Sequence, residues 1–192
     1  MGGDEWTRGA AELPGLEDFV LVGARVAAEV PQTAWSQARG DPEERERLAR
    51  MMHAAVREAW GLPLSDALEF QDLGPTLRGA FSLTDGSLRI AEWLLDRDDP
   101  SDVLQTLAHE NRHDMQRLML AGRLSHPGGV AGQRELDLWK RGLAEYRPGE
   151  VEGYVYNPVE TDARAAASGV VTGYWRATAE CLAQASESDE EE

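Results

Sequence analysis

The segment LAHENRHDMQ, residues 107–116, contains two of the chain's four histidines, His109 and His113. A spacing of four residues places both on one face of an α-helix, one turn apart, so that both rings can reach a single ion. Imidazole is a good zinc ligand, and Glu110, displaced around the helix, could take a proton from a water molecule activated by the metal. The pattern H-E-x-x-H therefore indicates a hydrolytic zinc site. The alternative is a solvated helix face on which the histidines bind no metal.

A catalytic zinc site with two histidines needs a third protein ligand, and the residues leave three candidates open. The first choice is Glu160, because Asn157 and Pro158 predict a helix start that puts this glutamate in the first turn. Alanines follow it and would let two helices approach closely, although Glu160 could instead belong to a capping box. Glu135 is the second choice, and His126 is a further candidate. The metzincin pattern is excluded, because glutamine and methionine stand where that class has glycine and histidine.

Other side chains could assist such a site. Asp162 or Asp114 could orient a ligand histidine through its second ring nitrogen, as carboxylates around metal sites do. The hydroxyl of Tyr154 or Tyr156 could stabilise an oxyanion. The alternative is that both acids are solvent-exposed charges and that both tyrosines pack against neighbouring residues.

The elements that must position these residues are mainly helical. Their predicted ranges are helices over 16–30, 42–60, about 100–121, 133–144 and 157–185 with a break near 168–169, a strand within 67–73, and a hairpin over 77–94 that turns at Asp85-Gly86. Since strands and helices do not alternate regularly, the order favours an α+β domain. We expect a small, mainly antiparallel sheet packed on the helix that carries the motif.

Composition limits the classes of partner. The 192 residues carry a formal net charge of -16, which argues against nucleic acid or an anionic membrane as a partner. The single cysteine, Cys181, excludes a disulfide within the chain. We expect a flexible N-terminus over 1–13, one domain over 14–185 and a disordered acidic tail over 186–192. No secretory signal or transmembrane segment is visible, which predicts a cytoplasmic protein unless it is exported by a non-classical route.

HENRHDMQ, followed much later by YNPVETDAR, resembles zincin-type metallopeptidases with a glutamate as third ligand. It is similar in particular to small bacterial stand-alone or toxin-associated metallopeptidases, over roughly residues 74–167. The resemblance implies a zincin-like fold, Zn²⁺ bound by His109, His113 and Glu160, and Glu110 as the catalytic base. It implies a hydrolase that cleaves peptide bonds in a peptide or protein substrate. The substrate's identity and the oligomeric state do not follow from it.

Two other functions fit parts of the sequence. A catalytically degenerate zincin could bind a metal or a partner without cleaving it, although the complete H-E-x-x-H favours an enzyme. An acidic interaction protein could use its helices and its tail to bind a basic partner.

Overall fold

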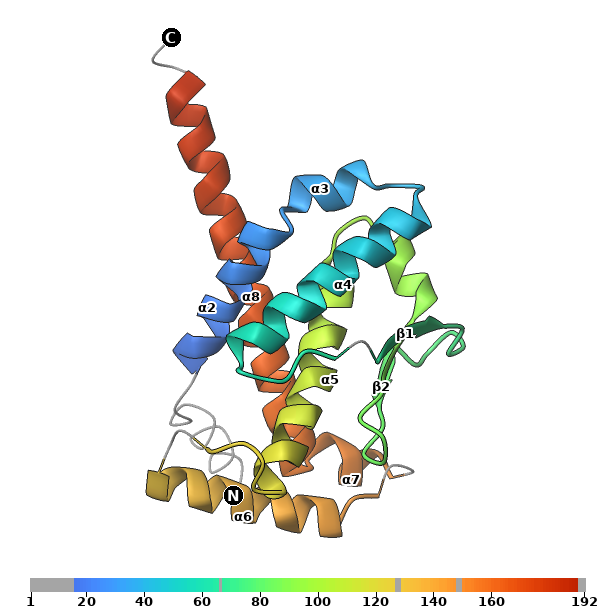
Figure 1. The fold of residues 1–192 in the computed structure, drawn as a ribbon, viewed down its shortest axis with the longest axis vertical. Helices are drawn as coiled ribbons and strands as arrows, with labels where there is room; N and C mark the ends of the chain where they lie inside the picture. The colour runs from blue at the N-terminus through green and yellow to red at the C-terminus, as the bar shows by residue number, and fades with distance from the viewer. Residues whose placement is uncertain (1–15, 66, 127–128, 148–149, 190–192) are drawn as a thin grey trace, which may run out of the picture.

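The computed structural model describes residues 16–65, 67–126, 129–147 and 150–189, and most of them are helical (Figure 1). The fold is α+β, as the sequence predicts, with one small sheet. The elements in chain order are α2 (Leu16–Glu29), α3 (Gln32–Gln37), α4 (Pro42–Ala59), β1 (Leu68–Gln71), β2 (Gly79–Phe81), β3 (Leu88–Ala91), the 3₁₀ helix η1 (Glu92–Asp96), α5 (Ser101–Leu120), α6 (Gly129–Ala144), α7 (Val151–Val155) and α8 (Pro158–Asp189).

Local signals in the sequence account for several helix ends. Asp41 is the N-cap of α4, and its Oδ1 accepts a hydrogen bond from the backbone N–H of Glu44 at 3.1 Å. Gly61 and Gly122 follow the ends of α4 and α5 with φ angles of 64° and 67°, a left-handed conformation that glycine adopts without strain. These ends agree with the predicted ranges.

The sheet is mixed, with strand order β1-β3-β2. β2 pairs antiparallel with β3, as the predicted hairpin requires, but β1 pairs parallel with β3. The expectation of a mainly antiparallel sheet therefore holds for one of the two strand pairs. β3 takes the central place because Leu88 and Ile90 are both buried. β2 is left as an edge strand beside α5.

Helix α8 is continuous, so the predicted break near residues 168–169 is wrong. The glycines there serve close packing against α2. A Cβ on Gly169 would lie 2.7 Å from Cβ of Phe19, and one on Gly173 would lie 1.9 Å from the backbone oxygen of Val20. On α2, a Cβ on Gly23 would lie 1.9 Å from the backbone oxygen of Val170. The two backbones therefore touch, which only glycine permits.

The C-terminal end of α8 projects beyond the rest of the molecule (Figure 1). The helix continues to Asp189, so residues 186–189 are helical where disorder was expected over 186–192. Neither proline nor glycine interrupts the chain there, so the helix that Ala183, Gln184 and Ala185 favour continues into these residues. The predicted flexible segment 1–13 and residues 190–192 lie outside the described residues.

Helix α5 lies in the middle of the fold, where it contacts α4, α8, β2 and β3 (Figure 1). The side chains that face these neighbours are fully buried: Val103, Leu104, Leu107 and Ala108. The residues after Ala108 on the same helix are therefore held in a rigid setting. Among the helices that the structure describes, none combines the length and apolar character of a membrane-spanning segment.

Candidate metal centre

The histidines of the motif lie side by side on α5. Nε2 of His109 is 3.1 Å from Nε2 of His113, and their side chains are 16% and 13% exposed. At most one proton can lie between two nitrogens at this distance, so at least one ring presents a lone pair to the other. The helical spacing thus produces the convergence of two imidazoles that the sequence predicts.

Glu160 joins this pair from the first turn of α8. Its Oε2 lies 3.3 Å from Nε2 of His109, and its Oε1 lies 3.6 Å from Nε2 of His113. The approach is possible because small side chains, Ala163, Ala166 and Ala167, are buried where α8 packs along α5. Asn157 caps α8, with its Oδ1 accepting a hydrogen bond from the N–H of Val159 at 2.9 Å. Neither oxygen of Glu160 bonds to the backbone of this first turn, so it is not the glutamate of a capping box.

The three side chains have the geometry of a divalent cation site. Their ligand atoms all lie within 4.8 Å of one another. Two atoms bound tetrahedrally to one zinc ion at about 2.1 Å stand roughly 3.4 Å apart, and the three closest pairs here are separated by 3.1, 3.3 and 3.6 Å. Oε2 of Glu160 is buried and makes no hydrogen bond, because its contact with His109 is an ion-pair approach without hydrogen-bond geometry. A cation would satisfy this atom.

Electrostatics couple the three groups. Burial raises the pKa of a carboxyl group, yet the pKa of Glu160 is lowered, because the adjacent imidazoles of His109 and His113 stabilise its charged form. Burial alone would lower the pKa of His113, but the carboxylates of Glu160 and Glu110 raise it above its ordinary value. Both shifts arise because the carboxylates and imidazoles at this point favour positive charge. The site attracts cations.

Tyr146 also contacts this centre, and nothing in the sequence pointed to it. Its hydroxyl donates a hydrogen bond to Oε1 of Glu160 at 3.1 Å. Burial and the carboxylate of Glu160 raise the pKa of Tyr146, which keeps the phenol protonated and able to donate. The residue lies between α6 and α7, in a segment without a recognisable motif, and only the fold brings it to Glu160.

Glu110 lies beside the histidines at a cleft of about 300 Å³. Its side chain is buried, and burial raises its pKa above the ordinary range while His109 and His113 act in the opposite direction. β2 passes close to it, since a Cβ on Gly79 would lie 3.3 Å from Cγ of Glu110. The cleft is lined by Thr76, Leu77, Arg78, Gly79, Gln105, Thr106, His109, Glu110, Tyr154, Arg164 and Ala167. A raised pKa lies closer to neutral pH, and a general base works best when its pKa is near the operating pH.

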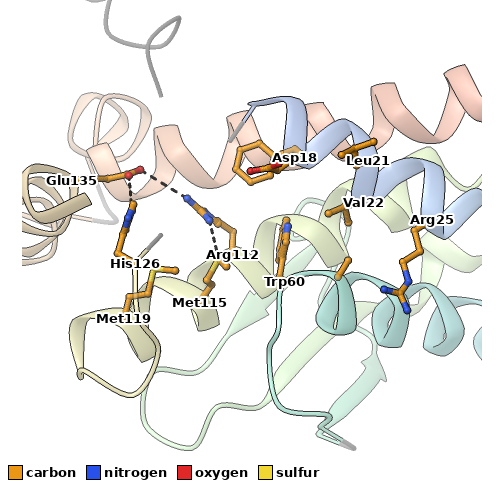
Figure 2. A pocket seen from close by; sticks show the side chains of 12 residues that line it. Asp18, Leu21, Val22, Arg25, Trp60, Arg112, Met115, Met119, His126 and Glu135 are labelled. Atoms are coloured by element: carbon orange, nitrogen blue, oxygen red, sulfur yellow. Dashed lines mark hydrogen bonds and ion pairs between the residues drawn. The ribbon is translucent and has the colours of Figure 1, made fainter. Parts of the chain in front are cut away.

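Glu135 and His126, the other candidates for third ligand, lie elsewhere. Oε2 of Glu135 is 2.7 Å from Nε2 of His126, and its Oε1 is 3.9 Å from Nη2 of Arg112. Figure 2 shows the pair at one end of a second cavity, of about 420 Å³, with Arg25 at the other end. Of the three candidates for third ligand, Glu160 is therefore the one that reaches the histidines.

The two aspartates considered as orienting groups have different positions. Asp114 bonds to Arg57 and Arg117, at 3.0 and 2.6 Å, so it does not orient a histidine of the motif. Asp162 does not touch a histidine either, but its Oδ2 accepts a hydrogen bond of 2.6 Å from Gln116. Gln116 in turn contacts Nδ1 of His113 at 2.9 Å. The predicted link between a carboxylate and a histidine is therefore indirect.

The two tyrosines considered for oxyanion stabilisation, Tyr154 in α7 and Tyr156 directly after it, also have different positions. Tyr154 lines the cleft, and burial together with the Glu160 carboxylate raises the pKa of Tyr154 to about 12. Tyr156 is 75% exposed and does not line the cleft. Tyr154 is thus the member of the pair that could meet a substrate. Arg164, one turn after Glu160, lines the same cleft.

Comparison of the chain with protein-family models, with curated proteins and with solved structures found no match.

Proposed function

We propose that the protein is a zinc-dependent metallopeptidase of the zincin type. The observation that carries the proposal is the convergence of His109, His113 and Glu160 beside a buried glutamate at a cleft. Two imidazoles and one carboxylate are the ligand set of catalytic zinc sites, which keep a further position open. A purely structural zinc site would be closed by a fourth protein ligand, and none of the described residues supplies one.

In peptide-bond hydrolysis, different residues of the chain would bind the metal, transfer the proton and stabilise the oxyanion. His109, His113 and Glu160 would hold the ion, which when bound would lower the pKa of water to about 7 and polarise a carbonyl group. Glu110 would accept the proton of the attacking water and pass it to the leaving amine. Tyr154, whose hydroxyl stays protonated, could donate a hydrogen bond to the oxyanion.

β2 offers a place for the substrate. It is an edge strand, and it runs beside the helix that carries Glu110. An extended peptide can pair with the free edge of such a strand, as peptides do in strand addition. The cleft residues of 76–79 lie immediately before or within this strand. A peptide held there would pass beside Glu110 and the point where His109, His113 and Glu160 converge.

Metal analysis of protein purified without added zinc tests the proposal. We expect about one zinc ion per chain, lost in His113→Ala and retained in His126→Gln, which removes a histidine outside the site. Glu110→Gln should keep the zinc and abolish cleavage of a fluorogenic peptide library. No bound zinc, or zinc that survives in His113→Ala, would refute the site. Zinc retention without cleavage by the wild-type protein would instead favour a catalytically degenerate binding module.

A further inference from the structure

Three buried polar side chains form a continuous hydrogen-bonded chain that ends at the half-buried His113. Arg112 donates from Nε and Nη2 to the two oxygens of Asp162, at 2.8 and 3.0 Å. Asp162 accepts a further hydrogen bond from Nε2 of Gln116 at 2.6 Å. Oε1 of Gln116 lies 2.9 Å from Nδ1 of His113. Arg112, Asp162 and Gln116 are all buried, so water does not compete for these bonds.

The orientation of the Gln116 amide follows from its neighbours. The nitrogen end faces two groups that only accept hydrogen bonds, the carboxylate of Asp162 at 2.6 Å and the backbone carbonyl of Val159 at 3.0 Å. If the amide were turned over, its oxygen would face both of these oxygens without a proton between them. That arrangement leaves buried acceptors unpaired and is strongly unfavourable. The oxygen of Gln116 must therefore face His113.

Arg112 fixes the other end of the chain. Its two-pronged bond engages both oxygens of Asp162 as acceptors. The guanidinium is itself held in place, because it lies over the rings of Phe19 and Trp139 at 5.2 and 5.3 Å and donates to Sδ of Met115. Figure 2 shows Arg112 reaching from α5 toward Met115 and Glu135 at the wall of the second cavity. The direction of every donor between Arg112 and His113 is thus determined.

We propose that Gln116 is a positioning residue that sets the tautomer of His113. An amide oxygen can only accept, so Nδ1 of His113 must carry the proton. In neutral imidazole the other nitrogen then has no proton, and its lone pair points toward Nε2 of His109 and Oε1 of Glu160, 3.1 and 3.6 Å away. Nε2 of His113 is ready to bind a metal before the metal arrives. The histidine side chain in water prefers the opposite tautomer, with the proton on Nε2.

The binding of zinc by this lone pair rests on the proposed function. The tautomer of His113 rests only on the hydrogen bonds of Gln116. NMR of ¹⁵N-histidine-labelled, metal-free protein, recorded on the high-pH plateau of the His113 signal where its ring is neutral, reports which nitrogen carries the proton. His113→Ala identifies the signal. We expect an Nδ1–H tautomer in the wild-type protein and a shift toward Nε2–H in Gln116→Met, which keeps the length of the side chain but removes the amide. Gln133→Met, a change at an exposed glutamine on α6, should leave the spectrum of His113 unchanged.

Zinc affinity, measured by competition with a chelator, gives a second readout. Loss of such an outer partner lowers metal affinity by about 10- to 100-fold, and we expect this for Gln116→Met but not for Gln133→Met. An Nε2–H tautomer in the wild-type protein overturns the proposal, and so does an Nδ1–H tautomer that persists in Gln116→Met. If Gln116→Met does not fold, the wild-type tautomer still decides. A wild-type protein that binds no zinc refutes the proposed function but leaves the tautomer result valid.

Discussion

Oε2 of Glu135 lies 2.7 Å from Nε2 of His126, and this contact holds Glu135 away from the histidines of the motif. The same carboxylate faces Arg112 at 3.9 Å, so its charge already has two partners. Glu160 has a different setting, with one oxygen bonded to Tyr146 and the other buried without a hydrogen bond. Two glutamates that the sequence could not separate are therefore separated by their partners.

The first prediction compares these two glutamates. Glu160→Gln should lower zinc affinity by at least about 100-fold, because it removes a charged ligand. Glu135→Gln should leave zinc affinity close to that of the wild-type protein, since Glu135 does not approach the histidines. Competition with a chelator measures both constants. Equal losses in the two variants would contradict the assignment of Glu160 as the third ligand.

The second prediction concerns the hydroxyl of Tyr146. Tyr146→Phe keeps the ring and removes the hydrogen bond to Oε1 of Glu160. We expect zinc affinity to fall by roughly tenfold, because the carboxylate is no longer held toward the histidines. Tyr156→Phe, at a side chain that is 75% exposed, is the matched control and should have no effect. An unchanged affinity in Tyr146→Phe would show that the contact does not orient Glu160.

The third prediction concerns the contact between β2 and α5. A Cβ on Gly79 would lie 2.5 Å from Cγ2 of Thr106, so Gly79→Ala should push the strand away from Glu110. We expect the free energy of unfolding to fall by about 1–3 kcal/mol, measured by urea denaturation, together with a loss of peptide cleavage. Thr106→Ser removes the methyl group that clashes. The double variant should therefore recover part of the stability, and a double variant as unstable as Gly79→Ala would show that Thr106 is not the cause.

The fourth prediction is a pH dependence that arises away from the metal centre. Burial, reinforced by the charge of Arg57, lowers the pKa of His53 to about 4 from an ordinary value of 6.5. The unfolded chain therefore binds a proton before the folded one does as the pH falls. The stabilisation is complete above about pH 6.5 and is lost progressively toward pH 4.

Between pH 8 and pH 5 this term amounts to roughly 2 kcal/mol. The free energy of unfolding of the wild-type protein should fall by about that much more than that of His53→Gln over the same range. Glutamine at this position keeps an acceptor for Asn111, whose Nδ2 lies 3.0 Å from Nδ1 of His53, and does not titrate. Parallel pH profiles for the two proteins would show that His53 is not the group responsible.

Short-range patterns account for the part of the fold and site that could be predicted. The four-residue spacing of the motif alone places His109 and His113 together, because helix geometry fixes it. Asp41 and Asn157 mark helix starts, because their side chains bond to backbone N–H groups a few residues away. In each case the decisive contact lies within one or two turns of the chain.

The rest depended on contacts between distant segments. Gly169 predicts a helix break from the sequence alone, but in the fold its missing side chain allows Phe19 to pack against α8. β1 pairs parallel with β3, although β2 lies between them in the chain, and the local pattern of neither strand specifies that partner. Tyr146 reaches Glu160 only through the packing of α6 and α7. Gln116 follows His113 by one turn, so the contact between them is local, but the orientation of the Gln116 amide depends on Asp162, which is distant in the chain.

The close contact between the backbones of α2 and α8 also determines how α8 presents Glu160 to the candidate metal centre. Gly173 lies about 20 Å along the helix axis from Glu160, at 1.5 Å per residue. Because the Gly23 and Gly173 contacts leave no space for side chains, α8 has one axial position and one rotation relative to α2. A slip of one residue would turn Glu160 by about 100° away from the histidines. Helix α2, which supplies no atom to the candidate site, thus fixes the position of Glu160 relative to the two histidines.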